Sequence, residues 1–364
     1  MRILHVFRTP VGGLFRHVRD LTRGQHAQGH DAGIICDSTT GGGMAEVLLG
    51  SIAPSCSLGI TRIPISRLPG LGDLAGTRAV MAQARILKPD IIHCHGAKGG
   101  LHGRIAAWRL GIPSVYTAHG GSLHYSWRSP SGAAFLGAEK ALTRIGTALH
   151  FVCQYERDTF AAKIGIAQKL NAVIHNGLWP EEFADFPLTD GASDLLFIGD
   201  MRILKGVDTL IEAVSICNRT RPTTALLVGD GPDLETFKAL SKTLELDGKI
   251  IFAGRMSAAE AFSRGNIVVM PSRAESFPYV VLESCAAGKP LVASSVGGIP
   301  EVLGTDMLVP PDDAQALADK LLALLGNPAA AQTAGAVQRL RVKQHFSAGD
   351  MVNNVLALYR AAAS

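Results

Sequence analysis

The sequence lacks the features that mark several well-known classes of protein. No apolar run approaches the roughly 20 residues of a membrane span, and the first eight residues, MRILHVFR, lack the long apolar core of a signal peptide. The six cysteines include no Cys-x-x-Cys pair, so we expect reduced thiols and neither disulfides nor a cysteine zinc site. They are Cys36, Cys56, Cys94, Cys153, Cys217 and Cys285. These absences predict a cytoplasmic protein.

Signatures of nucleic-acid, nicotinamide and metal binding are also missing. We find no helix-turn-helix, zinc finger or aromatic RNA-binding pattern, so we expect no nucleic-acid partner. The first strand-to-helix turn does not have the Gly-x-Gly-x-x-Gly spacing of a dinucleotide site, which counts against an NAD enzyme. No Asp-x-Asp triplet is present to hold a divalent ion. The sequence therefore predicts neither a metal nor a cofactor.

The sequence does contain a regular alternation of short apolar runs and helical segments. At 364 residues and 47% apolar content, the chain is long enough for two domains with a core each. We expect strands at residues 3–7, 32–36, 90–94, 114–117, 150–152 and 172–174, and then at 195–198, 225–228, 250–252, 267–270, 291–294 and 307–309. Helices are expected at 313–325 and 348–363. This is the pattern of two doubly wound α/β domains, which bind ligands at the carboxyl ends of their strands.

Two glycine-rich or acidic segments are predicted to lie outside these elements. Residues 176–193 carry proline, glycine and acidic residues and predict a linker between the domains. The Gly41–Gly42–Gly43 tract predicts a flexible surface loop.

Charge is divided unevenly along the chain. Residues 1–180 contain 19 Lys and Arg against 9 Asp and Glu, whereas the remainder contains 16 against 22. Eleven of the twelve histidines lie in the first half, which we expect to add positive charge at mildly acid pH. An anionic membrane surface or a phosphorylated acceptor is therefore the expected partner of this half.

Basic and aromatic residues are mixed within one stretch of the first half. Such mixing suits a membrane interface, but the alternative, which we prefer, is that Trp108 packs in the core while the charged residues are solvated. The residues concerned are Lys98, Arg104, Trp108, Arg109, Tyr125, Trp127, Arg128, Lys140 and Arg144. In the same half, Cys94 between His93 and His95 invites interpretation as a metal site. We prefer a buried strand end, because adjacent residues of a strand point to opposite faces.

The most informative stretch runs from residue 271 to residue 290 and contains Glu275 and Glu283. A strand ends at Pro271, and Pro278 sits at the start of a helix, so Glu275 belongs to the loop and Glu283 to the helix. Helix starts bind anions through unpaired backbone N–H groups. Two carboxylates at such a place suit a ligand that carries hydroxyls around its phosphates. A nucleotide sugar has this chemistry.

Other strand-to-helix turns contribute further candidates. Arg202 and Lys205 lie three residues apart after the strand at 195–198, where two cations oppose the helix dipole and indicate an anionic ligand. Gly12 and Gly13 let backbone approach a ligand closely, or simply make a tight turn. His119 follows the strand at 114–117 and either contacts a sugar or is structural. The glycine-rich turns at 228–232 and 294–301 are assigned supporting roles.

These residues resemble the retaining glycosyltransferases of family 4, which have the GT-B fold of two facing Rossmann-like domains. The resemblance rests on the Glu275-to-Glu283 element with the Ala-Ala-Gly-Lys-Pro that follows it, the Arg202–Lys205 pair ahead of Gly206, and the glycine loop at 12–13. It implies an N-terminal acceptor-side domain at 1–178 and a donor domain at 179–346, with a last helix at 347–364 that crosses back to the first domain. One departure is Pro278, where many members have glycine, so that one backbone N–H is missing.

Carried over to this sequence, the resemblance implies roles for individual residues. Arg202 and Lys205 would hold the donor diphosphate, Glu283 would bind ribose hydroxyls, and Glu275 would contact the transferred sugar. The remaining positions around the donor and acceptor are Gly12, Gly13, His119, Arg255, Met256, Ser276, Phe277 and Tyr279.

The predicted activity is retaining transfer of a sugar from a nucleotide diphosphate sugar to a sugar or lipid-linked acceptor, as in the synthesis of surface polysaccharide or glycolipid. We expect a cytoplasmic enzyme, with peripheral contact to an anionic inner membrane face as a further hypothesis. Two alternatives stay open, a sugar-nucleotide epimerase and a non-catalytic protein that binds a nucleotide sugar.

Overall fold

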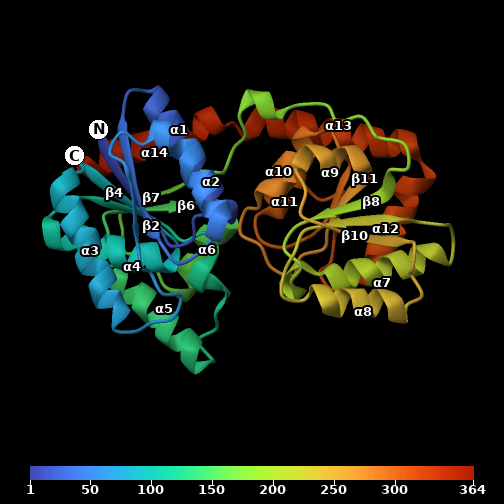
Figure 1. Cartoon of the computed structure of the whole chain (residues 1–364), viewed down its shortest axis with the longest axis horizontal. Coiled ribbons are helices and arrows are strands. Elements are labelled where there is room, and N and C mark those ends of the chain that lie inside the picture. The colour runs from blue at the N-terminus through green and yellow to red at the C-terminus, as the bar shows by residue number, and fades with distance from the viewer. The chain divides into compact units, whose positions relative to one another are not determined.

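The computed structural model describes all residues from Met1 to Ser364, which form two compact units (Figure 1). Unit 1 comprises Met1–Gly177 and Ala348–Ser364, and unit 2 comprises Leu178–Ser347. The divisions expected from the sequence, after residue 178 and before residue 347, each lie one residue from these. None of the helices combines the length and apolar character that a membrane crossing requires.

Unit 1 is built on a parallel sheet of seven strands in the order β3-β2-β1-β4-β5-β6-β7. Its strands are β1 (Arg2–Val6), β2 (Asp31–Asp37), β3 (Ile60–Ile63), β4 (Ile91–His95), β5 (Ser114–Thr117), β6 (Ala148–Phe151) and β7 (Leu170–Val173). Its α-helices are α1 (Gly12–Ala27), α2 (Gly42–Ile52), α3 (Gly72–Leu87), α4 (Gly96–Leu110), α5 (Pro130–Leu142), α6 (Gln154–Lys163) and α14 (Ala348–Ala363). Short 3₁₀ turns are η1 (Ala53–Ser55) and η2 (Gly121–His124).

The two faces of this sheet have different cores, because alternate residues of a strand point to opposite sides. Leu4, Val6, Ile92 and Cys94 belong to an apolar cluster that also includes residues of α3, α4 and α5. The intervening residues of β1 and β4 face α1 and α14, and among them are His5 and His93, which are direct partners in the β1–β4 register. One face is therefore hydrocarbon and the other is lined with histidine.

Unit 2 has a parallel sheet of six strands in the order β10-β9-β8-β11-β12-β13. Its strands are β8 (Ser193–Ile198), β9 (Ala225–Val228), β10 (Ile250–Gly254), β11 (Gly265–Met270), β12 (Leu291–Ser294) and β13 (Leu308–Val309). Its α-helices are α7 (Val207–Asn218), α8 (Leu234–Thr243), α9 (Ala258–Arg264), α10 (Tyr279–Ala286), α11 (Ile299–Leu303), α12 (Ala314–Gly326) and α13 (Pro328–His345), and its 3₁₀ turns are η3 (Pro180–Glu182) and η4 (Ile203–Lys205).

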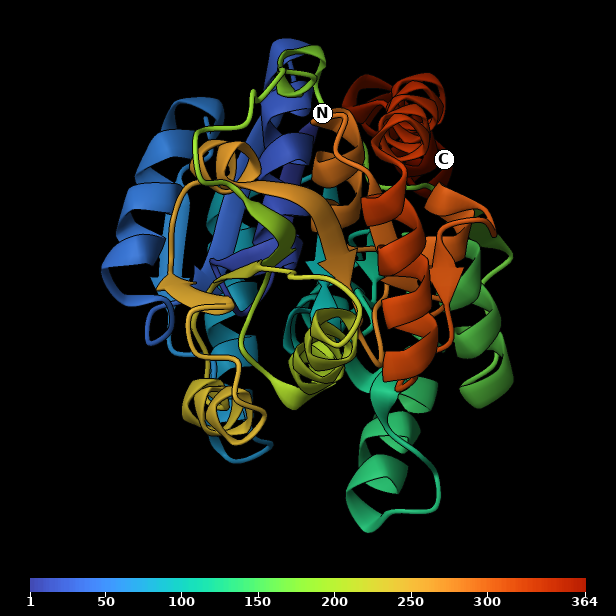
Figure 2. The same cartoon turned by 90° about the vertical axis from the view of Figure 1, so that its right-hand side faces the viewer.

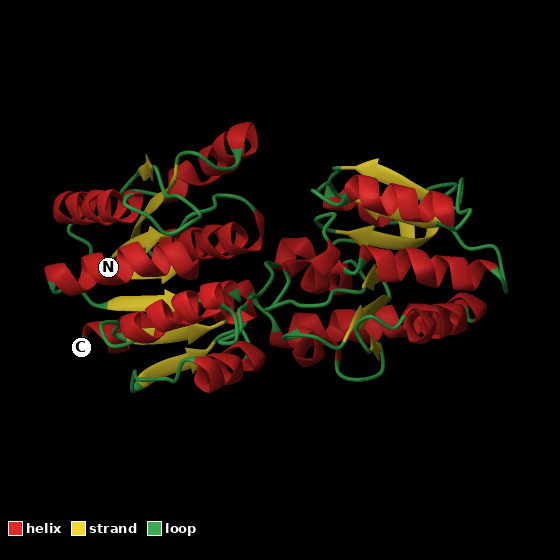
Figure 3. Ribbon diagram, turned by 90° about the horizontal axis from the view of Figure 1, so that it is seen from below, coloured by secondary structure: helices red, strands yellow, loops and turns green.

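Helices cover both faces of the unit 2 sheet (Figures 2 and 3). Residues of α7 and α12 share one apolar cluster with β8, β9 and β11, and α8 packs beside α7. The other face carries α9, α10 and α13, with α10 against α13. Burial on both faces explains why the strand sequences read as continuous apolar runs.

The structure confirms each expected strand to within a few residues and corrects the sequence analysis elsewhere. Strand β3 was not expected, because its sequence Ile-Thr-Arg-Ile is mixed and only its last residue is buried. The glycine tract at 41–43 was expected to be a flexible loop, but Gly42 and Gly43 are the first residues of α2. Helix α13 was also not expected. It has little amphipathic character for a sequence to show.

The buried ion pair between Arg104 and Glu139 is central to the hydrocarbon face of unit 1. Arg104 is fully buried and donates to Glu139 at 2.8 Å and to the carbonyl of Gly100 at 2.9 Å. The hydroxyl of Tyr116 donates to the other oxygen of Glu139 at 2.8 Å. The Glu139 carboxylate is thus charged, buried and paired within the helical layer.

Replacement of one partner of this pair is expected to be costly. Arg104→Met leaves the Glu139 charge buried without its counterion and should lower the free energy of unfolding by about 3–5 kcal/mol. Adding Glu139→Gln removes that charge and should recover part of the loss, while exposed Arg109→Met should change stability by less than about 0.5 kcal/mol. Urea unfolding followed by tryptophan fluorescence measures all three. An Arg104→Met protein as stable as the unmodified chain would contradict the role assigned to the pair.

Candidate functional site

The candidate donor residues lie where the strand order of unit 2 reverses. From β8 the chain proceeds outward through β9 and β10 on one side, and from β11 through β12 and β13 on the other. The loops after β8 and β11 therefore diverge in opposite directions, and in α/β proteins ligands bind at the carboxyl ends of strands at such a point. The β8 loop carries Arg202 and Lys205, and the β11 loop carries Glu275.

Lys205 and Glu275 are in direct contact, 70 residues apart in sequence. Lys205 Nζ lies 2.6 Å from Glu275 Oε1, and the Ser272 hydroxyl donates to the same oxygen at 2.8 Å. The two side chains are 23% and 9% exposed, respectively. A partly buried pair of this kind is less screened by salt than a surface pair. The structure thus brings together one predicted cation and one predicted acid.

The two loops are held against each other by backbone contacts. Arg273 N donates to the carbonyl of Leu204 at 2.9 Å. Gly206, with φ of +65°, sits so close to Pro271 that an added Cβ would lie 1.9 Å from the Pro271 carbonyl oxygen. Glycine is required here both for its positive φ and for the close approach.

Charges around the pair are unequally compensated. Arg273 donates to both carboxylate oxygens of Asp208, at 2.8 and 2.9 Å, and contacts Asp312 at 2.5 Å, so its charge is satisfied within the protein. Arg202 is exposed and its side chain makes no ion pair in the structure. We expected Arg202 at the start of a helix. In the structure it precedes the 3₁₀ turn η4 and not α7 itself.

Glu283, Ser276, Phe277 and Tyr279 lie at or near the start of α10. The helix begins at Tyr279 with Pro278 as its N-cap, as the sequence predicted, and Glu283 is in the second turn. Gly298 N donates to the carbonyl of Ser276 at 2.7 Å, which ties this loop to the turn before α11. Phe277 and Tyr279 are buried, and Phe277 packs against Phe346 with ring centres 5.7 Å apart.

The turns after β9 and β10 complete this edge of the sheet. Arg255 and Met256 directly follow β10, and the Arg255 side chain is exposed, 3.8 Å from Asp230. Asp230 lies in the glycine-rich turn after β9, where Met201 N donates to the Asp230 carbonyl at 3.1 Å. Asp233 in the same turn accepts from Ile203 N at 2.8 Å. This turn therefore supports the Arg202–Lys205 segment, as predicted for it.

In unit 1 the strand order reverses between β1 and β4, and the predicted residues again lie there. Gly12 begins α1 with φ of +79°, and a Cβ added at Gly12 or Gly13 would meet no atom within 4 Å, so this backbone is accessible. His119 follows β5 in a left-handed conformation with φ of +54°. A histidine with positive φ is uncommon and marks a constrained position.

Behind His119 lies a group of buried histidines that the sequence analysis did not recognise. His5, His93, His95 and His150 come from strands, whereas His17 comes from α1, and all five are fully buried. His93 and His95 lie on the same face, and Cys94 between them points into the opposite core. The sequence did contain a sign of this group, because His93 and His95 are two residues apart on one strand and His5 lies on the neighbouring strand.

Hydrogen bonds link most of these rings. His5 Nδ1 lies 3.0 Å from His95 Nε2, and His95 Nδ1 lies 3.1 Å from His119 Nε2. His93 contacts the hydroxyls of Tyr359 and Thr117 at 2.6 and 2.8 Å. The interpretation of residues 93–95 as an ordinary buried strand end therefore holds for Cys94, whereas the histidines form a polar layer.

Burial keeps these imidazoles neutral. Desolvation lowers the pKa of His5 and of His150 to about 4 and that of His119 to about 3, and it lowers the pKa values of His17, His93 and His95 well below the ordinary value. The expectation that the histidines add positive charge at mildly acid pH is therefore wrong for these six.

The basic and aromatic stretch of unit 1 does not form a single surface. Arg104 is buried, and Lys98 is 9% exposed and paired with Asp73 at 2.5 Å, so neither is available to a membrane. Trp108 and Trp127 are about half exposed, so the core interpretation of Trp108 is wrong. The Arg109 guanidinium lies over the Trp108 ring at 4.8 Å. Membrane contact stays a hypothesis carried by the exposed members alone.

A cavity of about 600 Å³ in unit 2 lies away from these residues. Asp194, Asn266 and Pro290, which line it, stand at the amino ends of β8, β11 and β12. Because ligand sites of doubly wound sheets lie at the carboxyl ends, its size alone does not make it the donor site.

Comparison with known proteins identifies the family to which the chain belongs. A family model described as Glycosyltransferase Family 4 matches residues 11–182, and one described as Glycosyl transferases group 1 matches residues 192–327. The chain belongs to glycosyltransferase family 4. It is 27% identical to the glycogen synthase of Mycobacterium tuberculosis, over 97% of this chain and 92% of that protein. It is 26% identical to the D-inositol 3-phosphate glycosyltransferase of Acidothermus cellulolyticus, over 79% of this chain and 72% of that protein.

Solved structures of glycosyltransferases share the fold. Sucrose-phosphate synthase from Thermosynechococcus elongatus superposes with a TM-score of 0.81 at 23% identity over the whole of both chains. Anabaena HepE in complex with UDP and glucose gives 0.84 at 20% identity, over 99% of this chain and all of the other. The expected fold, two Rossmann-like units of the GT-B class, is confirmed.

Displacement of the Glu275 loop is expected to impair this glycosyltransferase. Gly297 has φ of +60° and an added Cβ would lie 2.2 Å from the Glu275 carbonyl oxygen, whereas Gly304 has φ of +71° and open space. Gly297→Ala and Gly304→Ala both add backbone strain, of order 1–3 kcal/mol, but only Gly297→Ala should lower the transfer rate, by about 10²-fold for a shift near 1 Å. Initial rates and thermal unfolding of both variants separate the effects. Equal rates in the two variants would show that the loop position is unimportant.

Proposed function

We propose that this glycosyltransferase moves a sugar from a nucleotide diphosphate sugar to an acceptor hydroxyl with retention of anomeric configuration, and that it does so without a metal ion. The observation that carries the proposal is the contact of Lys205 with Glu275 at 2.6 Å, beside exposed Arg202, where the strand order of unit 2 reverses. A site with two cations and an acid suits a ligand that joins a diphosphate to a polyhydroxylated sugar.

Arg202 and Lys205 are assigned to the donor diphosphate. Departure of the diphosphate builds negative charge, which cations already in place stabilise as it develops. Arg273 cannot take this part, because Asp208 and Asp312 already satisfy it. The two cations replace the divalent ion that other transferases hold with an Asp-x-Asp triplet.

The acids and the unit 1 residues are assigned to hydroxyl recognition. Glu283 binds ribose hydroxyls and Glu275 contacts the transferred sugar, while Lys205 holds the Glu275 carboxylate in position. The leaving phosphate accepts the acceptor proton, so no side chain is assigned as general base. Backbone at Ser276 and Phe277 serves the phosphates and Tyr279 supports the loop, Arg255 and Met256 lie by the base, and His119, Gly12 and Gly13 serve the sugar and acceptor.

We propose a sugar or lipid-linked acceptor, and the names of the relatives, a glycogen synthase and a D-inositol 3-phosphate glycosyltransferase, support the first of these classes. A lipid-linked acceptor would bring the enzyme to an anionic membrane face, where the exposed Tyr125 and Trp127 of unit 1 are suited to an interface. Neither of the relatives reported above is an epimerase.

Transfer with these properties makes a direct experimental prediction. After a panel of nucleotide sugars has been screened by thermal shift, the best donor should release nucleotide only when an acceptor is added, and the rate should be unchanged in excess chelator. Proton NMR of the product should show the anomeric configuration of the donor. An isomerised donor would indicate an epimerase, an inverted product would exclude retention, and activity abolished by chelator and rescued by Mn²⁺ would exclude the metal-free assignment.

The two cations should contribute to rate more than to stability. Lys205→Ala and Arg202→Ala should each lower kcat by about 10²- to 10³-fold, because each removes a group that stabilises the developing charge. Lys238→Ala is the matched control, since Lys238 forms an exposed pair with Glu235 that contributes little. Steady-state rates with donor affinity measured by calorimetry test this. Unchanged kcat in both variants would remove the central assignment, and lost turnover with retained binding would exclude a purely non-catalytic binding protein.

A further inference from the structure

The histidine layer of unit 1 contains two groups of three rings that are close enough to share a ligand. The ring nitrogens of His5, His93 and His95 lie within 4.8 Å of one another, and so do those of His17, His95 and His119. No role in sugar transfer accounts for either group as a whole. The two groups differ in ring geometry and in the partners of their nitrogens.

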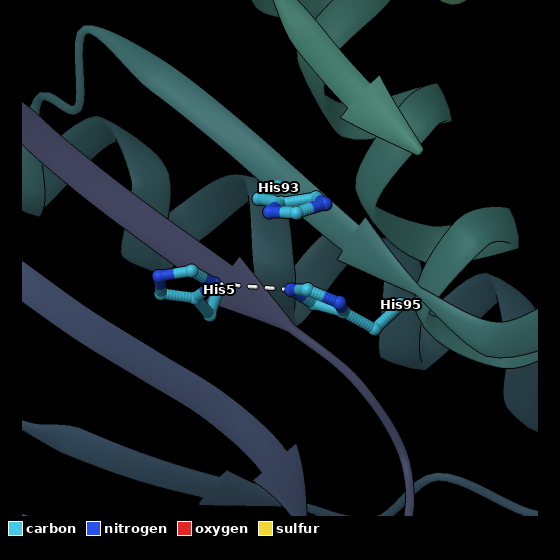
Figure 4. A group of neighbouring side chains, drawn as sticks. All are labelled: His5, His93 and His95. Carbon is cyan, nitrogen blue, oxygen red and sulfur yellow. Dashed lines mark hydrogen bonds between the residues drawn. The ribbon is translucent and has the colours of Figure 1, made fainter. Parts of the chain in front are cut away.

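The first group has the geometry of a hydrogen-bonded layer (Figure 4). The ring centres of His93 and His95 are only 3.9 Å apart, as in partly stacked rings. With a metal–nitrogen distance of about 2.1 Å, two imidazoles on one tetrahedral ion have centres about 5 Å apart. Both nitrogens of His93 are already bonded to the hydroxyls of Tyr359 and Thr117. This group is satisfied without an ion.

The second group has the spacing of a tetrahedral ligand set. The ring centres are 5.7 Å apart for His17 and His95, 4.9 Å for His17 and His119, and 5.4 Å for His95 and His119. All three distances are near the value of about 5 Å expected for three imidazoles around one ion. His17 lies on α1, His95 is the last residue of β4, and His119 follows β5. These positions meet where the strand order of unit 1 reverses.

The hydrogen bonds of this group show which nitrogens of His17 and His95 carry a lone pair. His17 Nδ1–H donates to the Asn176 side-chain carbonyl at 2.8 Å, so Nε2 carries the lone pair. That Nε2 is buried and has no hydrogen-bond partner. A buried polar atom without a partner costs about 1–3 kcal/mol, and a bound ligand is one explanation for such an atom.

The hydrogen bonds of His5 and His95 show in the same way which nitrogen of His95 carries the lone pair. His5 Nε2–H donates to the Gln25 carbonyl at 2.9 Å, so His5 Nδ1 accepts from His95 Nε2–H at 3.0 Å. His95 Nδ1 then has its lone pair directed at His119 Nε2, 3.1 Å away. Asn176 and His5 thus orient the two ligand rings from behind, as carbonyl and other acceptors do around histidine metal sites.

We propose that His17, His95 and His119 bind a divalent transition-metal ion of the zinc type, through His17 Nε2, His95 Nδ1 and His119 Nε2. The ion takes the place of the proton between His95 and His119, and that proton moves to His119 Nδ1. His119 is the only partly exposed member, so the fourth position opens on its side. Three protein ligands with one open position is the arrangement of reactive rather than purely structural zinc sites.

The chemistry of the site selects the kind of ion. Imidazole nitrogen suits Zn²⁺, Co²⁺, Ni²⁺ and Cu²⁺, whereas Mg²⁺ and Ca²⁺ need oxygen ligands, and the group contains no carboxylate. The proposal concerns unit 1 alone and assigns the ion no step in sugar transfer.

The test is a Co²⁺ titration of the tag-free, chelator-treated full chain. One equivalent should bind and produce the strong visible absorption of tetrahedral Co²⁺, and Zn²⁺ should displace it. His17→Gln and His95→Gln each remove a ligand and should weaken affinity at least 100-fold, whereas Asn176→Ala removes an orienting partner and should weaken it about 10- to 100-fold. The matched control is His93→Gln, on the same sheet face, which should bind Co²⁺ as the unmodified chain does.

Two results would overturn the proposal. One is absence of stoichiometric Co²⁺ or Zn²⁺ binding by the unmodified chain, and the other is loss of binding in His93→Gln with retention in His17→Gln. Because buried variants can fail to fold, paramagnetic NMR of the unmodified Co²⁺ form gives an independent readout, with three shifted imidazole N–H signals expected and fewer than three contradicting the ligand set. Sugar transfer is not measured here, so a failure of the transfer proposal leaves this test intact.

Discussion

The close packing of two loops at the strand reversal of unit 2 is the constraint on which the candidate donor site depends. Gly206 lies against the Pro271 carbonyl, and Arg273 N is bonded to the Leu204 carbonyl, so the loops after β8 and β11 cannot separate without breaking both contacts. This packing sets the 2.6 Å contact between Lys205 and Glu275. Rigid backbone therefore positions the charges before any ligand arrives, which is the condition for electrostatic stabilisation of a reaction.

Charge compensation differs among the cations of these loops, and this difference underlies the proposed binding of a diphosphate. Arg273 has two carboxylate partners and Lys205 has one, whereas the Arg202 side chain makes no ion pair in the structure. Arg202 is therefore the one of these three cations that has no carboxylate partner, and its side chain is exposed. A bidentate guanidinium suits a phosphate group better than an ammonium does. In the proposed donor site, the Glu275 carboxylate favours a ligand that brings hydroxyls together with its phosphates over a bare phosphate.

Much of this could be predicted because parallel strands buried on both faces leave continuous apolar runs, as at residues 225–228 and 291–294, whose predicted bounds match β9 and β12. Turns with Gly, Pro and charged residues then mark the carboxyl ends, which led to Arg202, Lys205 and Glu275. The edge strand β3 could not be predicted, because a half-exposed strand has no such run. The start of α2 at Gly42 was missed since glycine there reads as a loop.

The histidine layer was missed for a different reason, which also limits what net charge can reveal. Counting Lys, Arg and His in the first 180 residues treats each as a surface charge. Arg104, however, is neutralised in the core by Glu139, and five histidines are fully buried and His119 partly so, which keeps all six neutral. Whether an ionisable residue contributes to the surface field depends on strand alternation and tertiary pairing, neither of which composition contains.

The strand pattern at His5, His93 and His95 does contain part of this information. Beside Ile3 and Ile91, the positions of β1 and β4 on this face carry histidine instead of a hydrocarbon side chain, and each ring requires a polar partner. In the histidine layer that requirement is met by Gln25, Asn176, Thr117, Tyr359, the Ile174 carbonyl and the rings themselves. Among its buried nitrogens, His17 Nε2 is the exception, and this exception distinguishes a ligand set from a hydrogen-bonded core.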